Sequence, residues 1–120
     1  MSKKWQDQGL TAVVAPVFPH CAFRAEDADD MGLMLEYTLF WNILHYPCGV
    51  VPVTRVQQDE EDFSDTYNDG WTKLISKTCK GSAGMPIPVQ VVGHTYEDEK
   101  VLAVMQSIDK KIGFSMQVSK

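Results

Sequence analysis

The sequence lacks several features that would assign its 120 residues to a broad functional class. No apolar run approaches the roughly 18–20 residues of a membrane-spanning helix, and Met1-Ser2-Lys3-Lys4 leads into polar residues instead of the apolar part of an export signal. Positive charge is scarce, because 11 Lys and Arg face 16 Asp and Glu and give a net charge of −5, which opposes contact with nucleic-acid phosphates. We therefore expect an intracellular chain with no membrane segment and no nucleic-acid partner.

Cysteine is also scarce. Cys21, Cys48 and Cys79 form an odd number with no Cys-x-x-Cys pair, which favours a reducing compartment over a disulfide framework. His20 beside Cys21, and His45 near Cys48, invite a thiol nucleophile or a metal site. Neither spacing matches a known ligand pair, and free cysteine is among the most buried residue types. We therefore expect no metal, no other cofactor and no disulfide.

The glycine-containing segment Gly81-Ser82-Ala83-Gly84 lacks the marks of a catalytic or phosphate-binding loop. No lysine follows its second glycine as in a P-loop, and no partner histidine stands at the spacing of a serine nucleophile motif. Glycine readily adopts the positive φ values of turns and helix ends. We interpret the segment as a tight turn.

Apolar residues are plentiful enough for a folded unit. The chain is 44% hydrophobic and 10% aromatic against 22% charged, which excludes disorder as its default state, and its length suits one domain or part of one. The patterns predict strands over 11–18, 50–56 and 87–92, and helices over 31–45, from an acidic loop at 59–62 up to Gly81, and over 97–112. Pro86 and Pro88 place the third strand at a strand start or a sheet edge. This alternation predicts an α/β fold whose helices cover a small sheet.

The expected helix over 31–45 is apolar nearly all round. Met31, Met34, Leu35 and Leu39 recur at helical spacing, and the other sides are apolar as well, at Phe40, Trp41, Ile43 and Leu44. A helix of this kind is normally buried, so we expect it to be the central buried element. These apolar residues, together with Trp71, have two interpretations. In the first they belong to the hydrophobic core, and in the second they form the wall of a ligand site.

Three segments together resemble the C-terminal part of the amidase signature family. They are Leu-Thr-Ala-Val-Val-Ala-Pro at 10–16, Trp-Asn-Ile-Leu-His-Tyr-Pro-Cys-Gly-Val-Val-Pro at 41–52, and Gly-Met-Pro-Ile-Pro-Val-Gln-Val-Val-Gly at 84–93, which Tyr-Glu-Asp-Glu follows at 96–99. Within the family the chain is most similar to animal fatty-acid amide hydrolases. The marks are the segment 46–56, the acidic linker 59–62, Trp71 and the Ser-x-Gly-x-Pro segment at 82–86.

The resemblance implies a fold for this chain and a position for the catalytic residues outside it. Residues 1–120 would be the C-terminal portion of a single amidase domain, a strand-helix-strand-helix-strand-helix fragment of a mixed central sheet covered by helices. The family hydrolyses amides with a serine nucleophile, a bridging serine and a lysine base that lie upstream of the matching region. We therefore expect no catalytic residue in this chain and no activity from it alone.

The resemblance also implies what the chain binds. Positions matching Leu35, Leu39 and Trp71 would face the acyl chain of a fatty-acid amide substrate. The other partners would be the upstream half of the domain and a second copy of the protein. Intact family members are membrane-associated. Two functions stay open: part of a fatty-acid amide hydrolase-like enzyme, or a non-catalytic binding module that kept the amidase fold.

Overall fold

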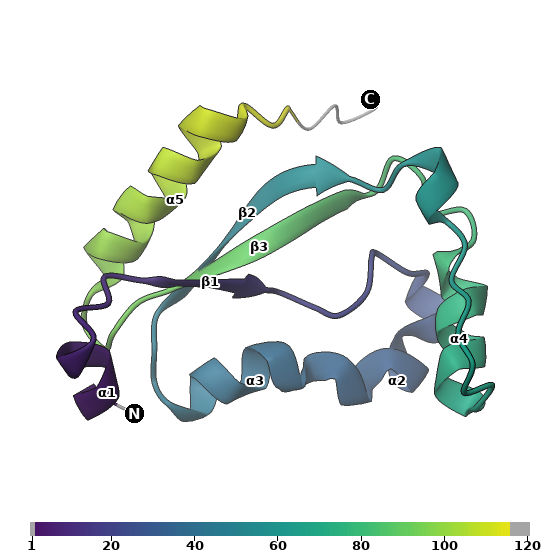
Figure 1. The fold of residues 1–120 in the computed structure, drawn as a ribbon, viewed down its shortest axis with the longest axis horizontal. Coiled ribbons are helices and arrows are strands. Elements are labelled where there is room, and N and C mark those ends of the chain that lie inside the picture. The colour runs from purple at the N-terminus through teal and green to yellow at the C-terminus, as the bar shows by residue number, and fades with distance from the viewer. Residues whose placement is uncertain (1, 116–120) are drawn as a thin grey trace.

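The computed structural model describes residues 2–115 and contains one three-stranded sheet in that part of the chain (Figure 1). The strands are β1 (Val13–Pro16), β2 (Cys48–Arg55) and β3 (Pro86–Val92), in the order β1-β3-β2. Both neighbouring pairs are antiparallel, with Val91 opposite Val14 on one side and opposite Gly49 on the other. The predicted α/β class and the three predicted strands are therefore confirmed.

Strand β3 lies at the centre of the sheet and not at its edge. Val91 and Val92 are fully buried, because β3 has a neighbour on each side. The prolines predicted either a strand start or a position at the sheet edge. The strand start is confirmed for Pro86, and the edge position is wrong for β3. Pro88 is tolerated because β1 ends opposite Val89, so the strand there has a neighbour only in β2, where Pro52 faces Pro88 beside a bulge.

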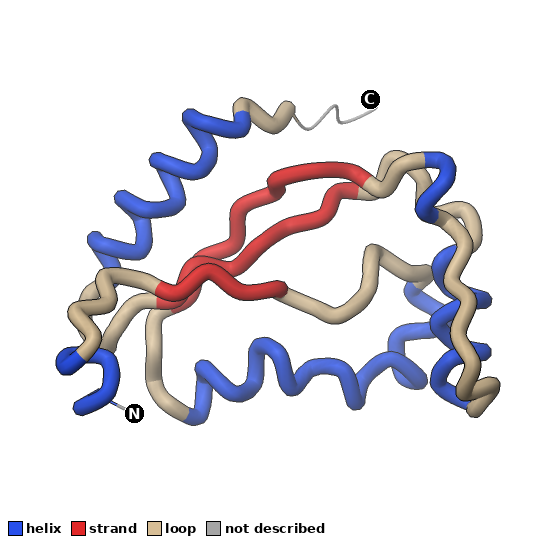
Figure 2. The backbone as a smooth tube through the Cα atoms, in the orientation of Figure 1, coloured by secondary structure: helices blue, strands red, loops and turns tan. Residues whose placement is uncertain are grey.

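The helices surround this sheet (Figure 2). The α-helices are α1 (Ser2–Asp7), α2 (Ala28–Met31), α3 (Glu36–Ile43), α4 (Gly70–Cys79) and α5 (Asp98–Ile112), and the short 3₁₀ turns are η1 (Ala25–Asp27), η2 (Gly32–Leu35) and η3 (Gln58–Glu60). In Figure 1 the sheet runs between α5 and α3, while α4 lies beyond its far end. Within residues 2–115, no helix has the length and apolar character that crossing a bilayer requires.

Local sequence explains where the two longest helices begin and end. Asp69 caps α4, since its carboxylate accepts the backbone N–H of Thr72 at 2.9 Å. Helix α5 begins with two acids and ends with Lys110 and Lys111, which complement the helix dipole, and Gly113 stops it in a left-handed conformation. The prediction of a helix over 97–112 is confirmed.

The prediction that the helix over 31–45 is the central buried element is wrong. The segment is broken into the end of α2, the turn η2 and α3, and α3 has no buried residue. Leu35, Leu39 and Ile43 are 55%, 53% and 68% exposed. The other side of the segment faces the hydrophobic core, where Trp41 and Leu44 pack against Trp5, Tyr46 and Val92. The apolar pattern shows which faces of the helix favour burial. Within the described residues, only the face of Trp41 and Leu44 is packed against the rest of the protein.

Two glycines allow α5 to approach the sheet closely. A methyl group on Gly93 would lie 2.5 Å from Cγ2 of Val101, and one on Gly49 would overlap the side chain of Met105. Valine has a stiff side chain, so the contact at Gly93 cannot be relieved by a simple rotation. The glycines therefore set the spacing between α5 and the β2–β3 pair.

We expect Gly93→Ala to lower the free energy of unfolding by about 1–3 kcal/mol, the usual cost of overpacking a core. Gly32 is the matched control, because it has helical dihedral angles and open space around it. Gly32→Ala should raise stability by roughly 0.5–1 kcal/mol, since alanine loses less backbone entropy on folding. Urea unfolding of both variants measures the difference. Equal effects of the two substitutions would contradict the packing described here.

Candidate functional site

The structure brings two of the three predicted substrate-binding residues together. Leu35 and Leu39 lie one helical turn apart on the same side of the α2–α3 segment, and Ile43 continues their row by another turn. We call this row the apolar stripe. Trp71 lies at the start of α4, which does not pack extensively against α3 (Figure 1), so the structure does not join it to the other two.

A groove that sequence reasoning missed lies beside α3. It has a volume of about 470 Å³, and its walls come from the end of β1, the centre of β3 and α3, with Pro16, Tyr37, Phe40, Trp41 and Gln90 among the lining residues. This is within the usual range of small-molecule sites, roughly 300–1,000 Å³. The available signal was the second apolar side of the helix, where Phe40 and Trp41 stand. The sequence pattern alone predicts burial of that side.

Gln90 fixes α3 against the sheet at the floor of this groove. Its side chain is 2% exposed, and Nε2 donates to the carbonyl oxygen of Pro16 at 2.6 Å and to that of Tyr37 at 2.9 Å. The amide thus links β3 to the end of β1 and to the first turn of α3. A buried amide with both donors occupied is fixed in orientation, because losing either bond leaves a buried N–H without a partner.

The segment 81–84 forms the predicted tight turn. Gly81 and Gly84 have φ values of 80° and 83°, and the Ser82 carbonyl accepts the N–H of Met85 at 2.9 Å. Glu61 of the acidic linker accepts the N–H of Ala83 at 2.6 Å, so this acid has a structural contact. Ser82 is 3% exposed and its hydroxyl has no hydrogen-bond partner, which gives it no base to act as a nucleophile.

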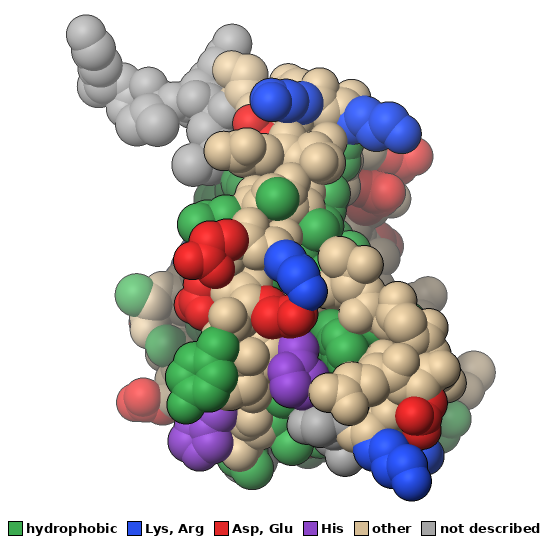
Figure 3. All heavy atoms as spheres, turned by 90° about the vertical axis from the view of Figure 1, so that its left-hand side faces the viewer, with side chains coloured by type: hydrophobic (Ala, Val, Ile, Leu, Met, Phe, Trp, Pro, Cys, Tyr) green, Lys and Arg blue, Asp and Glu red, His purple; other side chains and the backbone are tan. Residues whose placement is uncertain are grey.

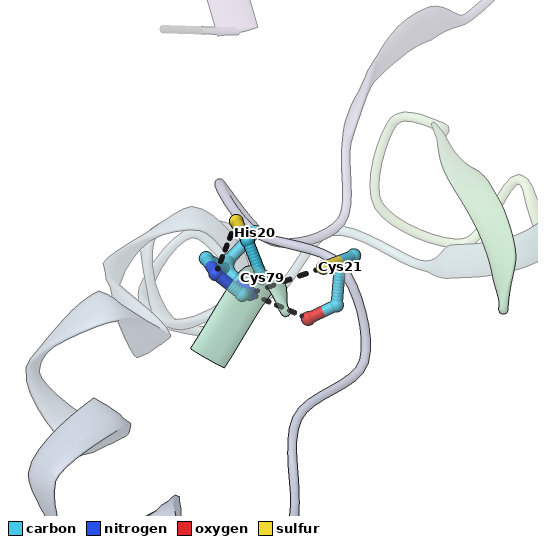
Figure 4. A group of neighbouring side chains, drawn as sticks. All are labelled: His20, Cys21 and Cys79. Atoms are coloured by element: carbon cyan, nitrogen blue, oxygen red, sulfur yellow. Dashed lines mark hydrogen bonds between the residues drawn. The ribbon is translucent and has the colours of Figure 1, made fainter. Parts of the chain in front are cut away.

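The histidines and cysteines are arranged differently from the two sequence pairs considered above. His20 and Cys21, in the segment after β1, meet Cys79 at the end of α4, and one ligand atom from each lies within 4.8 Å of the others (Figure 4). His45 and Cys48 form no such group within residues 2–115, since the Cys48 thiol donates to the Tyr46 carbonyl. We call His20, Cys21 and Cys79 the Cys-His cluster.

Burial raises the pKa of Cys79 to about 11, and the neighbouring Cys21 adds to this increase. Burial also raises the pKa of Cys48. Both groups are therefore thiols at neutral pH in the metal-free chain, and neither has the depressed pKa of a reactive nucleophile.

We expect the alkylation rate of Cys79 by iodoacetamide to rise with pH up to about 11 in the folded, metal-free chain, because only the thiolate reacts. The folded state holds the proton that an unfolded cysteine releases near pH 8.5. Mass spectrometry of chains labelled at a series of pH values follows the reaction. The same measurement in urea is the control and should give a midpoint near the ordinary value. A midpoint near 8.5 in the folded chain would contradict the environment described for Cys79.

The face over α1 and α5 differs from the apolar stripe. Figure 3 shows acidic, basic and hydrophobic side chains intermixed there, without a continuous apolar row. Leu102 on α5 is 58% exposed, close to the value for Leu39. It therefore offers a matched position for testing the stripe.

Comparison with known proteins decides the family. The sequence profile of the family described as Amidase matches residues 1–102. The chain belongs to the amidase family. It is 29% identical over 120 residues to fatty-acid amide hydrolase 1 of Sus scrofa, an alignment that covers 97% of this chain and 21% of that protein. It is 41% identical over 78 residues to fatty acid amide hydrolase 1 of Caenorhabditis elegans, covering 62% of this chain and 14% of that protein.

The similarity extends to amidases with other names. An acetamidase of Emericella nidulans is 26% identical over 121 residues, covering 92% of this amidase chain and 21% of that protein. The chain thus spans about a fifth or less of the length of these relatives. The resemblance to the amidase family and to its animal fatty-acid amide hydrolases is confirmed.

Proposed function

We propose that this chain is part of an amidase that hydrolyses fatty-acid amides, and that it supplies strands of the core sheet and one wall of the acyl-binding channel. The observation that carries the proposal is the apolar stripe. Its three large aliphatic side chains, Leu35, Leu39 and Ile43, lie in one row and are each more than half exposed. The two relatives named fatty-acid amide hydrolase support the substrate class.

The stripe has the dimensions and chemistry that an acyl chain requires. Eight residues of helix separate its ends, which at about 1.5 Å per residue gives a row about 12 Å long. Each methylene removed from water against such a surface contributes about 0.8 kcal/mol. Trp71 belongs to the same wall in this proposal, although it lies in a separate element and the structure does not join it to Leu35 and Leu39.

In this proposal the catalytic groups belong to another part of the enzyme. Amide hydrolysis by a serine needs a base within hydrogen-bonding reach of its hydroxyl. In this chain the hydroxyl of Ser82 has no partner, and that of Ser107 donates to the Ala103 carbonyl within α5. Following the resemblance to the amidase family, the proposal assigns the serine nucleophile and its base to the upstream half of the amidase domain, and makes that half the partner of this chain.

Truncation of Leu39 in the assembled enzyme tests the acyl wall. We expect Leu39→Ala to lower kcat/KM for a long-chain fatty-acid amide about tenfold, which corresponds to roughly 1.4 kcal/mol of lost apolar contact. Turnover of acetamide, which has no long acyl chain, should change less than about twofold. Steady-state kinetics with both substrates gives the ratio.

Leu102→Ala is the control, because it removes the same side chain at a similar exposure from a different helix. It should leave both substrates unaffected. A loss that is equal for long-chain amide and acetamide, or that is the same at Leu102 as at Leu39, would contradict the proposed wall. A preference for acetamide in the unsubstituted enzyme would move the substrate class toward that of the acetamidase relatives.

A further inference from the structure

The Cys-His cluster lies apart from the apolar stripe and has no part in the proposed amide hydrolysis. Its members come from two segments that are distant in sequence, since His20 and Cys79 are 59 residues apart. Figure 4 shows the imidazole of His20 between the two cysteines. The Cys79 sulfur is 3.3 Å from Nε2 and the Cys21 sulfur is 3.5 Å from Nδ1.

The hydrogen bonds of His20 fix which of its nitrogens is free. Nδ1 lies 2.7 Å from the backbone carbonyl oxygen of Cys21. A carbonyl oxygen can only accept, so Nδ1 carries the proton and donates it there. The lone pair is then on Nε2, which faces Cys79 and has the Ile75 carbonyl oxygen only at the longer distance of 3.5 Å. Metal-binding histidines usually hold one ring N–H on a carbonyl or carboxylate in this way and bind the ion through the other nitrogen.

We propose that His20 Nε2, Cys21 Sγ and Cys79 Sγ bind a zinc ion, with the fourth position open to water. Two thiolates and one imidazole are soft and borderline ligands, which select zinc over magnesium or calcium. Three protein ligands with one open position are a known arrangement for zinc. This proposal replaces the expectation of no metal, which rested on the pairs His20–Cys21 and His45–Cys48 and did not include Cys79.

Zinc binding would draw the three ligand atoms closer together. In a tetrahedral zinc site with bonds of about 2.0–2.3 Å, neighbouring ligand atoms are about 3.3–3.8 Å apart. One ligand atom from each residue of the cluster already lies within 4.8 Å of the others, and the Cys21 sulfur, which is now beside Nδ1, would turn toward Nε2 on binding. Thr78 now has its hydroxyl 3.0 Å from His20 Nε2, but it also has the Leu74 carbonyl at 2.9 Å and can keep that bond when zinc takes the nitrogen.

The surroundings leave space on one side of the cluster. A cavity of about 250 Å³ is lined by His20 and Cys21 together with Phe18, Phe23 and Ile87. It is large enough for a water molecule at the fourth position. Binding forms two Zn–S bonds and one Zn–N bond, and the two thiol protons pass to solvent. No oxidant or reductant takes part.

Zinc at this position would join two segments that few other contacts hold together. The segment after β1 reaches α4 through His20, whose Nε2 also lies near Thr78, and through the ion pair of Asp27 with Lys77 at 2.8 Å. A ligand that binds the folded state alone stabilises it by mass action. With zinc at a hundred times its dissociation constant, we expect the Tm of the reduced chain to rise on the order of 10 °C.

Metal titration of the reduced, chelator-treated 120-residue chain tests the site. Cobalt(II) added as a spectroscopic probe should give one thiolate-to-cobalt charge-transfer band per chain, and zinc should displace it at one equivalent. Cys21→Ser, Cys79→Ser and His20→Gln should each weaken binding by more than the roughly 10–100-fold that outer-shell substitutions cost. Cys48→Ser is the matched control and should bind like the parent chain, because Cys48 lies outside the cluster.

A second measurement needs no variant. One equivalent of zinc should protect Cys21 and Cys79 from alkylation while Cys48 stays reactive, as mass spectrometry of the labelled chain would show. The proposal is overturned if a chain with folded circular dichroism gives no thiolate-to-cobalt band. It is also overturned if binding survives loss of both cluster cysteines, or if Cys48→Ser abolishes it.

Discussion

Replacing Gln90 with leucine is expected to lower the free energy of unfolding by about 1–3 kcal/mol, as large an effect on stability as any single substitution proposed for this chain. The substitution keeps the approximate size of a side chain that is 2% exposed but removes both of its donors. The carbonyl oxygens of Pro16 and Tyr37 would then each lose a partner inside the protein. Each of these hydrogen bonds contributes about 0.5–1.5 kcal/mol, so the loss of both gives the expected range.

The same substitution at an exposed glutamine separates this effect from a general cost of leucine. Gln106 lies on the exposed side of α5, and Gln106→Leu should change stability by less than about 0.5 kcal/mol. Urea unfolding curves give both values. Hydrogen exchange gives a second readout, because Gln90→Leu should increase exchange in α3 before it affects α5. Equal stability of the two variants would contradict the role assigned to Gln90.

Some of this structure follows from local sequence patterns. Helix α5 was predicted correctly because its signals are all local: acids in the first turn, bases in the last and a glycine after it. The strands were predicted from short valine-rich runs between prolines and glycines. Helix α1 was not predicted, since its six residues are too few to show a period and Trp5 is its only large apolar residue.

Other features depend on the tertiary arrangement and have no local signal. Apolar residues all round a helix indicate which sides avoid water, but they do not say what covers each side, and so the burial of α3 was predicted wrongly. The central position of β3 depends on two strands that pair with it from distant parts of the chain. The Cys-His cluster joins residues 59 apart, a spacing that no short motif describes.

The predicted site residues came from the resemblance to the amidase family and not from periodicity. For Leu35 and Leu39 the structure gives a shared, exposed helix side, which suits contact with an acyl chain. Their role in binding substrate stays a prediction, as does that of Trp71. The groove beside α3 could have been found only by knowing that β1 and β3 lie against that helix.

The second large effect is the absence of activity. The 120-residue chain alone is expected to show no hydrolysis of a long-chain fatty-acid amide above the uncatalysed rate. A positioned nucleophile with its base and oriented substrate supply most of the reduction in the barrier, and the proposed function places that nucleophile and base in another part of the enzyme. Product analysis by mass spectrometry over an extended incubation gives the sensitivity needed. Ser82→Ala and Cys48→Ser variants are the controls for any turnover that is found, since turnover lost in either variant would identify that side chain as catalytic.

The most direct test of the central claim is a chimaera in which this chain replaces the aligned 120 residues of the Sus scrofa fatty-acid amide hydrolase 1. The account predicts that the folded chimaera hydrolyses a long-chain fatty-acid amide, that Leu39→Asp in the inserted segment abolishes this turnover, and that Leu102→Asp does not. A folded chimaera without turnover, or turnover by the 120-residue chain alone, would contradict the account.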